Sequence, residues 1–312
     1  MTTHRLTEDA TGVYIISVTP FTDDGAIDYD SADKLVEFYV ESGVSGITIL
    51  GMMGEAPKMA PEESTAFLDH MMHRVANRVP VVVGVSNAGL DNLNRLSQHA
   101  MDKGAAGVMI APNPGQNTEA KLTGYFDQVV TTLGPDIPIV YQDYPQSTGV
   151  HISVPTFNQM VRDHDQIVML KHEDCPGLSK LSSVRRSAVD EVLRRVSILV
   201  GNGGLYLPQE MARGADGAMT GFGYPEMLVN VVKLCRAADW DGAEDLFDAY
   251  LPIVRHEQQP GWGLAVRKEV LRRRGVLNSA ATRSPGPSLS TIDHDELGRL
   301  MDRVQRNVEN LA

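Results

Sequence analysis

The feature that most constrains the fold of this chain is the regular alternation of short apolar runs with longer amphipathic stretches. Short runs rich in β-branched residues predict strands. The runs are continuously apolar rather than alternating, as in Val79–Val85, and this pattern is typical of a parallel sheet buried on both faces. The predicted strands are Val13–Val18, Gly46–Leu50, Val79–Val85, Gly107–Ala111, Ile137–Tyr141, Ile167–Leu170, Ser197–Val200 and Gly217–Met219.

The segments that follow these runs carry apolar residues three or four positions apart and charged residues elsewhere, which predicts helices. Eight strand–helix units in series favour a closed (β/α)8 barrel, an α/β fold. A doubly wound open sheet is the alternative, but Val18-Thr19-Pro20-Phe21 stands where its Gly-x-Gly-x-x-Gly loop would follow the first strand. The predicted helices are Asp30–Glu41, Pro61–Asn77, Asp91–Lys103, Thr118–Leu133, Val154–Asp163, Gly177–Leu193, Tyr206–Ala212 and Glu226–Ala237.

The strand pattern ends near Ala238, so we divide the chain into a barrel over 1–238 and a C-terminal helical extension over 239–312. Its expected helices are Asp241–Val254, Gly261–Arg274 and Asp293–Asn310. The extension has too little apolar surface to fold alone, and we expect it to pack on the barrel. Arg267, Lys268 and Arg272–Arg274 make one of these helices basic, and we interpret them as a solvated face or part of a subunit contact.

Charge and composition exclude several classes of partner. The net charge of −12 repels nucleic acid and anionic membranes, and no run approaches the ~20 apolar residues of a membrane span. The polar start of the chain lacks the apolar stretch of a signal peptide, which favours a cytoplasmic protein. Cys175 and Cys235 are too few for a disulfide framework, so we expect reduced thiols.

In a (β/α)8 barrel the active site lies at the C-terminal ends of the strands, and Lys171 follows the apolar strand Ile167–Leu170 directly. A lysine there should project towards the barrel mouth and be partly desolvated, which disfavours the ammonium form. A neutral amine can attack a ketone to form a Schiff base. The alternative is a lysine that is paired with Glu55, Glu173 or Asp174 only for stability.

Tyr141 ends the neighbouring predicted strand, and its phenol could relay protons for an imine-forming lysine. The alternative is a tyrosine with a buried ring and a solvated hydroxyl. Tyr144, three residues later, competes for the same role.

Glycine-rich turns at three other strand ends are candidates for substrate binding. The turn Gly51-Met52-Met53-Gly54 can present successive backbone N–H groups to an anion such as a substrate carboxylate. Gly201 and Asn202 begin a similar turn, and Gly221 follows the last predicted strand. Each could instead be an ordinary tight turn. His172 and Glu173 are adjacent and should point to opposite sides of a strand, so we expect no metal and no other cofactor.

Taken together, these strand ends resemble the dihydrodipicolinate synthase / N-acetylneuraminate lyase family of class I aldolases. The resemblance runs from about Gly12 to Ala238, and a helical C-terminal region is also typical of that family. Its motifs are similar to Thr19-Pro20-Phe21, to Gly51–Glu55, to Leu170-Lys171 with Glu173, and to Tyr141 with 145–149.

The resemblance implies a mechanism. Lys171 would condense with the ketone of pyruvate or a related 2-oxo acid, and the imine would allow the neighbouring carbon to lose a proton and form an enamine. The enamine adds to an aldehyde, the reverse reaction cleaves a C–C bond, and in some members the intermediate expels water. The tyrosine would relay protons, and the Gly51–Gly54 turn would hold the carboxylate. A homotetramer is common in the family, and closed homo-oligomers are the general rule.

Departures from the family pattern concern the substrate more than the fold. The family synthases usually carry two threonines where Met52 and Met53 stand here, and methionine cannot relay a proton. They also carry an arginine where Ser147 stands, and a second tyrosine after the fourth strand that is missing in 111–114. The tyrosine motif is one residue longer than usual, which leaves Tyr141 and Tyr144 as alternatives.

These departures disfavour lysine biosynthesis and suggest a less polar second substrate or a different reaction branch. The sequence therefore predicts a Schiff-base aldolase or lyase of a small 2-oxo acid. The alternatives are a dehydratase of a 2-keto-3-deoxy sugar acid, a dihydrodipicolinate synthase proper, and a non-catalytic binding protein on the same scaffold.

Overall fold

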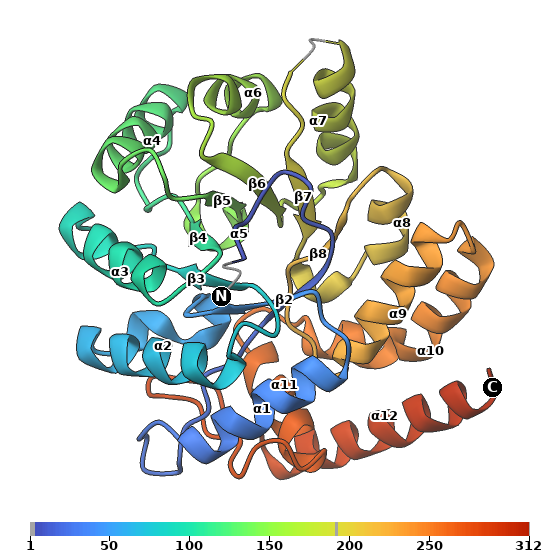
Figure 1. Cartoon of the computed structure of the whole chain (residues 1–312). Helices are drawn as coiled ribbons and strands as arrows, with labels where there is room; N and C mark the ends of the chain where they lie inside the picture. The colour runs from blue at the N-terminus through green and yellow to red at the C-terminus, as the bar shows by residue number, and fades with distance from the viewer. Residues whose placement is uncertain (1–3, 191–192, 312) are drawn as a thin grey trace.

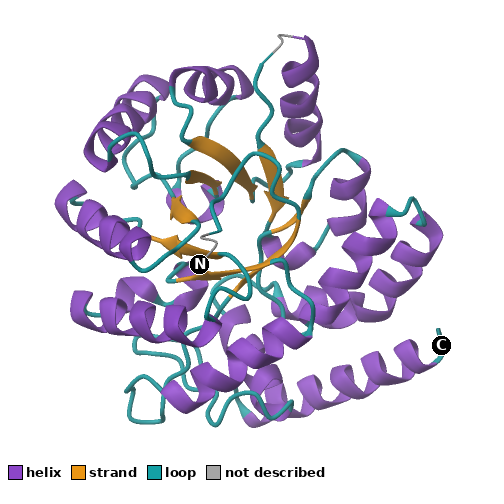
Figure 2. Ribbon diagram, in the orientation of Figure 1, coloured by secondary structure: helices purple, strands orange, loops and turns teal. Residues whose placement is uncertain are grey.

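Each predicted apolar run forms a strand in the computed structural model, which describes residues 4–190 and 193–311. Neighbouring strands pair in parallel, and the last strand pairs with the first, so the sheet closes into a barrel (Figures 1 and 2). The expected (β/α)8 fold is confirmed. The strands are β1 (Gly12–Ile16), β2 (Gly46–Ile49), β3 (Val81–Gly84), β4 (Gly107–Ile110), β5 (Ile139–Asp143), β6 (Ile167–His172), β7 (Ser197–Val200) and β8 (Gly217–Ala218).

The strands are apolar throughout because both of their faces are buried. One set of side chains, including Val82, Val140 and Met169, fills the barrel interior, and the alternate set packs against the surrounding helices. A register irregularity between β5 and β6 precedes Met169, after which Gln142 pairs with Lys171. Strand alternation therefore gives Met169 and Lys171 the same inward face.

Helices surround the barrel, as the spacing of apolar residues predicts (Figure 2). The last residues of the helix expected over Gly177–Leu193 include 191 and 192, which lie outside the described residues. Short elements that we did not expect follow three strands: η1 (Met52–Gly54) and η2 (Ala56–Lys58), α5 (Pro145–Thr148), and η3 (Asn202–Gly204). The main helices are α1 (Tyr29–Glu41), α2 (Pro61–Val75), α3 (Leu90–Asp102), α4 (Glu119–Leu133), α6 (Val154–Asp163), α7 (Leu178–Asp190), α8 (Leu207–Ala212) and α9 (Pro225–Arg236).

The C-terminal extension consists of α10 (Trp240–Glu257), α11 (Gly263–Arg273) and α12 (Thr291–Glu309). The boundary drawn at residue 238 falls between α9 and α10. Helix α10 packs against α9, and α12 packs along α10 on one side of the barrel (Figure 1). Buried apolar residues of α10, such as Phe247 and Ile253, belong to the same core as the barrel helices.

The N-terminal segment crosses the end of the barrel opposite to the strand C-termini. The Leu6 N–H donates to the carbonyl of Ala106, which precedes β4, and the Leu6 side chain joins the interior core. In Figure 1 this segment passes over the middle of the barrel. It closes the bottom of the barrel and leaves the C-terminal ends of the strands for the site.

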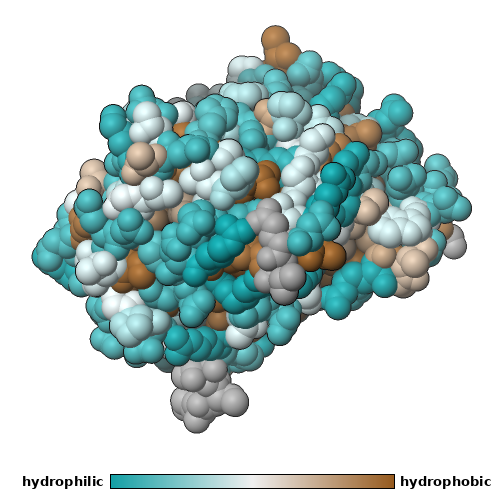
Figure 3. Space-filling view, turned by 90° about the horizontal axis from the view of Figure 1, so that it is seen from above, coloured by the Kyte–Doolittle hydropathy of each residue, from teal (hydrophilic) through white to brown (hydrophobic). Residues whose placement is uncertain are grey.

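The surface in Figure 3 is mainly hydrophilic, with separated hydrophobic side chains rather than one broad apolar patch. None of the helices in the described residues combines the length and hydropathy that a bilayer crossing requires.

Candidate active site

Lys171 lies near the C-terminal end of β6 and is only 4% exposed. Its Nζ is 3.0 Å from Oε2 of Glu173, whose side chain is also nearly buried. The same Oε2 accepts a 2.7 Å hydrogen bond from the Gln142 amide on β5. The amine therefore sits beside a fixed counter-ion, and a buried charge pair of this kind is electrically balanced.

Glu173 reaches Lys171 because the chain turns directly after β6. The Glu173 N–H donates to the Asp143 carbonyl, and the Asn202 amide donates to the Glu173 carbonyl. A Cβ at Gly201 would overlap the Glu173 side chain. Gly201 thus permits the close approach of Glu173 to the β7 turn and does not itself line the chamber beside Lys171.

The turn after β2 faces Lys171. Met52 and Met53 open the short helix η1, and the first N–H groups of a helix have no partner within it. Such N–H groups can hold a carboxylate. Gly54 closes the turn: its carbonyl accepts a 2.6 Å hydrogen bond from the buried hydroxyl of Thr19. Gly54 therefore anchors the turn and does not line the chamber.

A chamber of about 60 Å³ lies between these elements, with Lys171 in its wall. Seven of the residues proposed from the sequence meet there: Gly51, Met52, Met53, Tyr144, Lys171, Asn202 and Gly221. Seven more line it that we did not propose as site residues: Ile16, Gln142, Glu173, Gly203, Thr220, Gln258 and Arg267.

The two tyrosines that the sequence left open are separated by the barrel wall. Tyr141 is fully buried among the barrel helices, where its ring packs against Phe126 and Phe157. Its hydroxyl has no hydrogen-bond partner among the described residues. Tyr144 lines the chamber with Lys171. It follows Asp143, the last residue of β5, so the alternation of side chains along the strand does not fix its direction. Of the two candidates, Tyr144 is therefore the one that lines the chamber with the amine, and Tyr141 does not.

The charges around Tyr144 act on its hydroxyl in opposite directions. Burial raises the pKa of Tyr144, the Glu173 carboxylate raises it further, and the Arg267 guanidinium lowers it. The hydroxyl therefore keeps its proton at neutral pH, as a group that donates and accepts protons during a reaction requires.

Arg267 and Lys268 are not a solvated face, which corrects the interpretation made from the sequence. Both are buried, Arg267 at 3% and Lys268 at 0% exposed. The Arg267 Nε donates to Oε1 of Glu257 at 2.6 Å, and Lys268 Nζ pairs with Oε1 of Glu55 at 2.7 Å. Helix α11 thus carries one cation into the chamber and another to the turn after β2.

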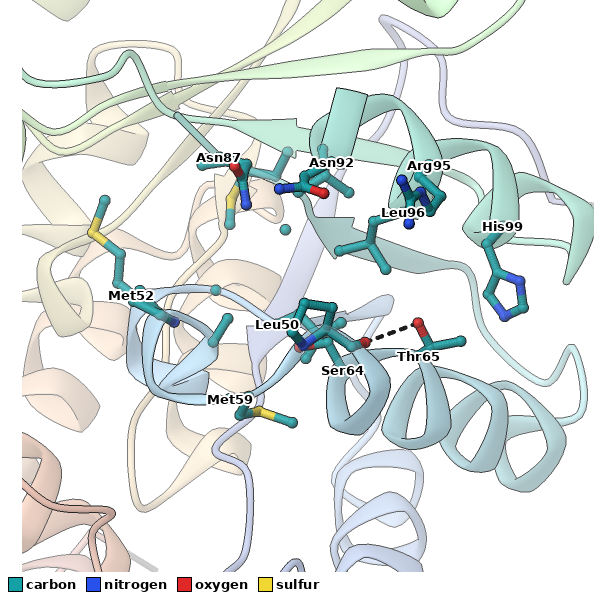
Figure 4. A pocket seen from close by; sticks show the side chains of 18 of the residues that line it. Leu50, Met52, Met59, Ser64, Thr65, Asn87, Asn92, Arg95, Leu96 and His99 are labelled. Atoms are coloured by element: carbon teal, nitrogen blue, oxygen red, sulfur yellow. Dashed lines mark hydrogen bonds between the residues drawn. The ribbon is translucent and has the colours of Figure 1, made fainter. Parts of the chain in front are cut away.

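A larger cavity of about 600 Å³ lies between α2 and α3, and Figure 4 shows the side chains that line it. It shares Gly51, Met52 and Gln142 with the chamber, so the two spaces meet at the turn after β2. Apolar residues such as Leu50, Met59 and Leu96 line it beside polar residues of α3. The volume is in the range of small-molecule sites, and the cavity lies next to the chamber.

Sequence reasoning could have found some of the missed residues but not others. Gln142 pairs with Lys171, so strand alternation applied from Tyr141 onwards places it on the inward face. Thr220 lies two residues after β8, and its hydroxyl accepts from the Gly203 N–H at 2.7 Å. Gln258 and Arg267 follow no strand, and only the packing of the extension brings them to the chamber.

Comparisons with known proteins agree with this architecture. The model of the dihydrodipicolinate synthetase family matches residues 9–304. A crystal structure of a dihydrodipicolinate synthase from Rhodopseudomonas palustris is 48% identical, with a TM-score of 0.94 over 96% of this chain and 99% of that one.

Two further relatives are not named as dihydrodipicolinate synthases. L-2-keto-3-deoxyarabonate dehydratase from Azospirillum brasilense is 29% identical over 94% of both chains. The Escherichia coli prophage protein YagE, whose crystal structure contains pyruvate, is 26% identical with a TM-score of 0.86, over 95% of this chain and 98% of that one. The family match spans nearly the whole length, and the chain belongs to the dihydrodipicolinate synthetase family.

Proposed function

We propose that the protein is a Schiff-base lyase that acts on pyruvate or a related 2-oxo acid through Lys171. The observation that carries this proposal is the chamber, in which a nearly buried lysine lies beside Glu173, Tyr144 and the N–H groups of the turn after β2. The family consists of class I lyases and synthases, and its Schiff-base lysine segment resembles the segment around Lys171.

The first step joins the enzyme to its substrate. The Met52 and Met53 N–H groups hold the carboxylate of the 2-oxo acid, which places its ketone near Lys171. Lys171 first gives a proton to Glu173, and its neutral Nζ attacks the ketone carbon to form a C–N bond. The former carbonyl oxygen takes one proton from this nitrogen and one from Glu173 and leaves as water, which gives the protonated imine. Glu173 stays beside the nitrogen and balances the positive charge of the protonated imine.

The second step makes the neighbouring carbon a nucleophile. The protonated imine accepts the electron pair of a C–H bond as the proton leaves, which gives an enamine. Tyr144 is the group in the chamber that can relay this proton. In the synthetic direction the enamine adds to an aldehyde, and in the reverse direction cleavage of a C–C bond generates the enamine. In the dehydratase branch the enamine expels a hydroxide from the next carbon, which leaves as water once it is protonated.

A dehydratase of a 2-keto-3-deoxy sugar acid is the second candidate, because the dehydratase relative matches 94% of both chains. A dihydrodipicolinate synthase proper is the third candidate: the relative from Rhodopseudomonas palustris that is 48% identical carries that name, but two features of the site argue against it. Met52 and Met53 offer no hydroxyl for a proton relay, and Ser147, which stands in place of the family arginine, donates instead to the Met52 sulfur at 3.2 Å. A non-catalytic protein is supported only by these same substitutions.

The decisive experiment is reductive trapping. The protein is incubated with pyruvate and longer 2-oxo acids, reduced with borohydride, and analysed by intact and peptide mass. We expect a reduced adduct on the Lys171 peptide that is missing in Lys171→Ala. If the folded protein traps no acid, the lyase proposal is wrong and the binding-protein alternative takes its place.

Product analysis separates the reaction branches. C–C cleavage of a 2-keto-3-deoxy sugar acid releases pyruvate and an aldehyde, whereas dehydration keeps the carbon chain whole. We expect the reaction to take place in the cytoplasm and to need no added metal or cofactor.

A further inference from the structure

We infer that Arg267, on the C-terminal extension, determines substrate specificity by donating a hydrogen bond to a hydroxyl oxygen of the substrate beyond its third carbon. The inference rests on the proposed function and adds to it a recognition residue, which favours the hydroxylated acids among the candidate substrates. Four observations carry it.

The first observation is an unused donor. Arg267 is 3% exposed, and its Nη1 is buried with no hydrogen-bond partner among the described residues. Burying a donor without a partner costs the protein the full free energy of desolvating that group. Such groups call for an explanation, and a hydrogen bond to a bound substrate is one that fits a residue in the wall of a chamber.

The second observation is the direction of the guanidinium. Arg267 lines the same chamber as Lys171. A Cβ at Gly221, which follows β8, would overlap Nη1 of Arg267 and come within 2.9 Å of the Ile16 carbonyl. The missing side chain at Gly221 therefore leaves the space that Nη1 occupies above the ends of β1 and β8.

The third observation is the rigidity of the arrangement. Glu257 accepts from Arg267 Nε through Oε1 at 2.6 Å and from the Gly223 N–H through Oε2 at 3.1 Å. Both carboxylate oxygens are thus occupied on one side of the guanidinium. Arg267 is held in one orientation, as a group that recognises a substrate must be.

The net charge of the Arg267–Glu257 pair determines whether a hydroxyl or a carboxylate oxygen of the substrate suits Nη1. Glu257 compensates Arg267, and Glu173 compensates Lys171, so the chamber has no free positive charge for a second carboxylate. The first carboxylate is accounted for by the turn after β2. A second buried carboxylate would be uncompensated and costly, whereas a neutral hydroxyl oxygen satisfies the Nη1 donor without adding charge.

The fourth observation is the polarity of the same wall. Asn202, Thr220 and Gln258 line it beside Arg267, and all three are neutral groups that can donate and accept hydrogen bonds. The turn of Met52 and Met53 forms the less polar wall. The expectation of a less polar second substrate therefore applies only to the wall that Met52 and Met53 form. The wall beside Arg267 suits hydroxyl groups.

The test compares three acids of equal carbon number. They are 2-oxopentanoate, 4,5-dihydroxy-2-oxopentanoate and 2-oxoglutarate, which end in a methyl group, a hydroxyl group and a carboxylate. Dissociation constants are measured by calorimetry in the full-length Lys171→Met protein, which cannot form an imine. We expect the dihydroxy acid to bind about 10- to 100-fold more tightly than 2-oxopentanoate, as a hydrogen bond from a charged donor implies.

Arg267→Lys keeps a cation beside Glu257 but removes the Nη1 donor, and we expect the ratio of the two dissociation constants to fall to about one. Arg272→Lys is the matched control, since Arg272 lies on the same helix, pairs with Glu269 and is exposed. Arg272→Lys should leave the ratio of the two dissociation constants unchanged. If Arg267→Lys does not fold, the double variant Glu257→Gln/Arg267→Met removes both charges together and should also lose the ratio.

An unchanged ratio in a folded Arg267 variant would overturn the inference, as would tightest binding of 2-oxoglutarate. Borohydride trapping with the Lys171 protein is run in parallel. If it traps no acid while the ratio still depends on Arg267, the lyase proposal fails and the role of Arg267 stands. If trapping succeeds and the ratio is one in every protein, only the role of Arg267 is wrong.

Discussion

Tyr141 and Tyr144 are three residues apart, and the barrel wall separates their rings. Residue 141 lies within β5, where alternation turns its side chain towards α4 and α6. Residue 144 follows the strand and caps the short helix α5, so its side chain reaches the chamber. The difference between them decides which phenol lies in the chamber with Lys171.

We expect Tyr144→Phe to lower kcat by about 10²- to 10⁴-fold, the range for loss of a general acid or base. Tyr141→Phe should leave kcat unchanged and should not destabilise the protein, because the hydroxyl it removes is buried without a partner. Steady-state kinetics with the best-trapped 2-oxo acid, together with urea unfolding, tests both. A large loss of kcat in Tyr141→Phe alone would reverse the assignment.

A second group of ionisable residues lies behind β6, on its helix-facing side. Asp143 pairs with Lys180 at 2.7 Å, and His172 Nδ1 is 3.6 Å from the same carboxylate oxygen. Glu210 on α8 is 6% exposed, and its Oε2 has no partner among the described residues. Burial raises the pKa of Glu210 to about 7, which His172 partly opposes and Glu173 reinforces.

This raised pKa makes stability depend on pH. The folded state binds the Glu210 proton more tightly than the unfolded state, so the contribution is fully present below about pH 4.5 and is lost as the pH rises to about 7. A shift of this size corresponds to about 3 kcal/mol.

We therefore expect Glu210→Gln to raise the free energy of unfolding, relative to the wild type, by about 2 to 3 kcal/mol more at pH 8 than at pH 5. Urea unfolding at the two pH values measures it. Glu62→Gln, at an exposed glutamate, is the control and should show no such difference. The same difference at both pH values for Glu210→Gln would contradict the assignment.

At the scale of elements, the C-terminal extension holds the turn after β2. Glu55 directly follows η1 and is 1% exposed. Its carboxylate accepts from Lys268 on α11, from Lys58 and from the Arg283 N–H. Lys268 Nζ also lies 4.5 Å from the centre of the Phe21 ring. Two of the three groups that hold the turn, Lys268 and Arg283, therefore lie more than two hundred positions later in the chain.

We expect Lys268→Met to destabilise the protein by about 3 kcal/mol, because it leaves a buried carboxylate with fewer partners. Hydrogen exchange at the amides of residues 51–55 should become faster, and the KM for the 2-oxo acid should rise. Arg272→Met, which removes an exposed cation of the same helix, is the control. Equal stability of Lys268→Met and the wild type would show that the turn does not depend on α11.

At the scale of the whole molecule, we predict a homotetramer in solution. Closed homo-oligomers are the general rule for soluble assemblies, and the tetramer is the form that the resemblance stated from the sequence implies. Light scattering should give a mass about four times the chain mass of 34.0 kDa. A single chain mass at micromolar concentration would contradict the prediction.

The order of strands and helices could be predicted because each depends on a local pattern. Continuous apolar runs formed the barrel strands, and amphipathic spacing formed the helices around them, with bounds that differ by a few residues. Lys171 could be placed at the chamber for the same reason, since the C-terminal ends of barrel strands meet at one face. These predictions need only residues close together in the chain.

The remainder of the site was decided by tertiary structure. The choice between Tyr141 and Tyr144 depends on where β5 ends, and a shift of one residue reverses the side to which a side chain points. The sequence pattern predicts that Arg267 is a solvated basic residue. Only the packing of α11 buries it against Glu257 in the wall of the chamber. The sequence alone thus determined the barrel and the place of Lys171 at the ends of its strands. Contacts between distant segments decided which groups surround that lysine, because no local pattern encodes such contacts.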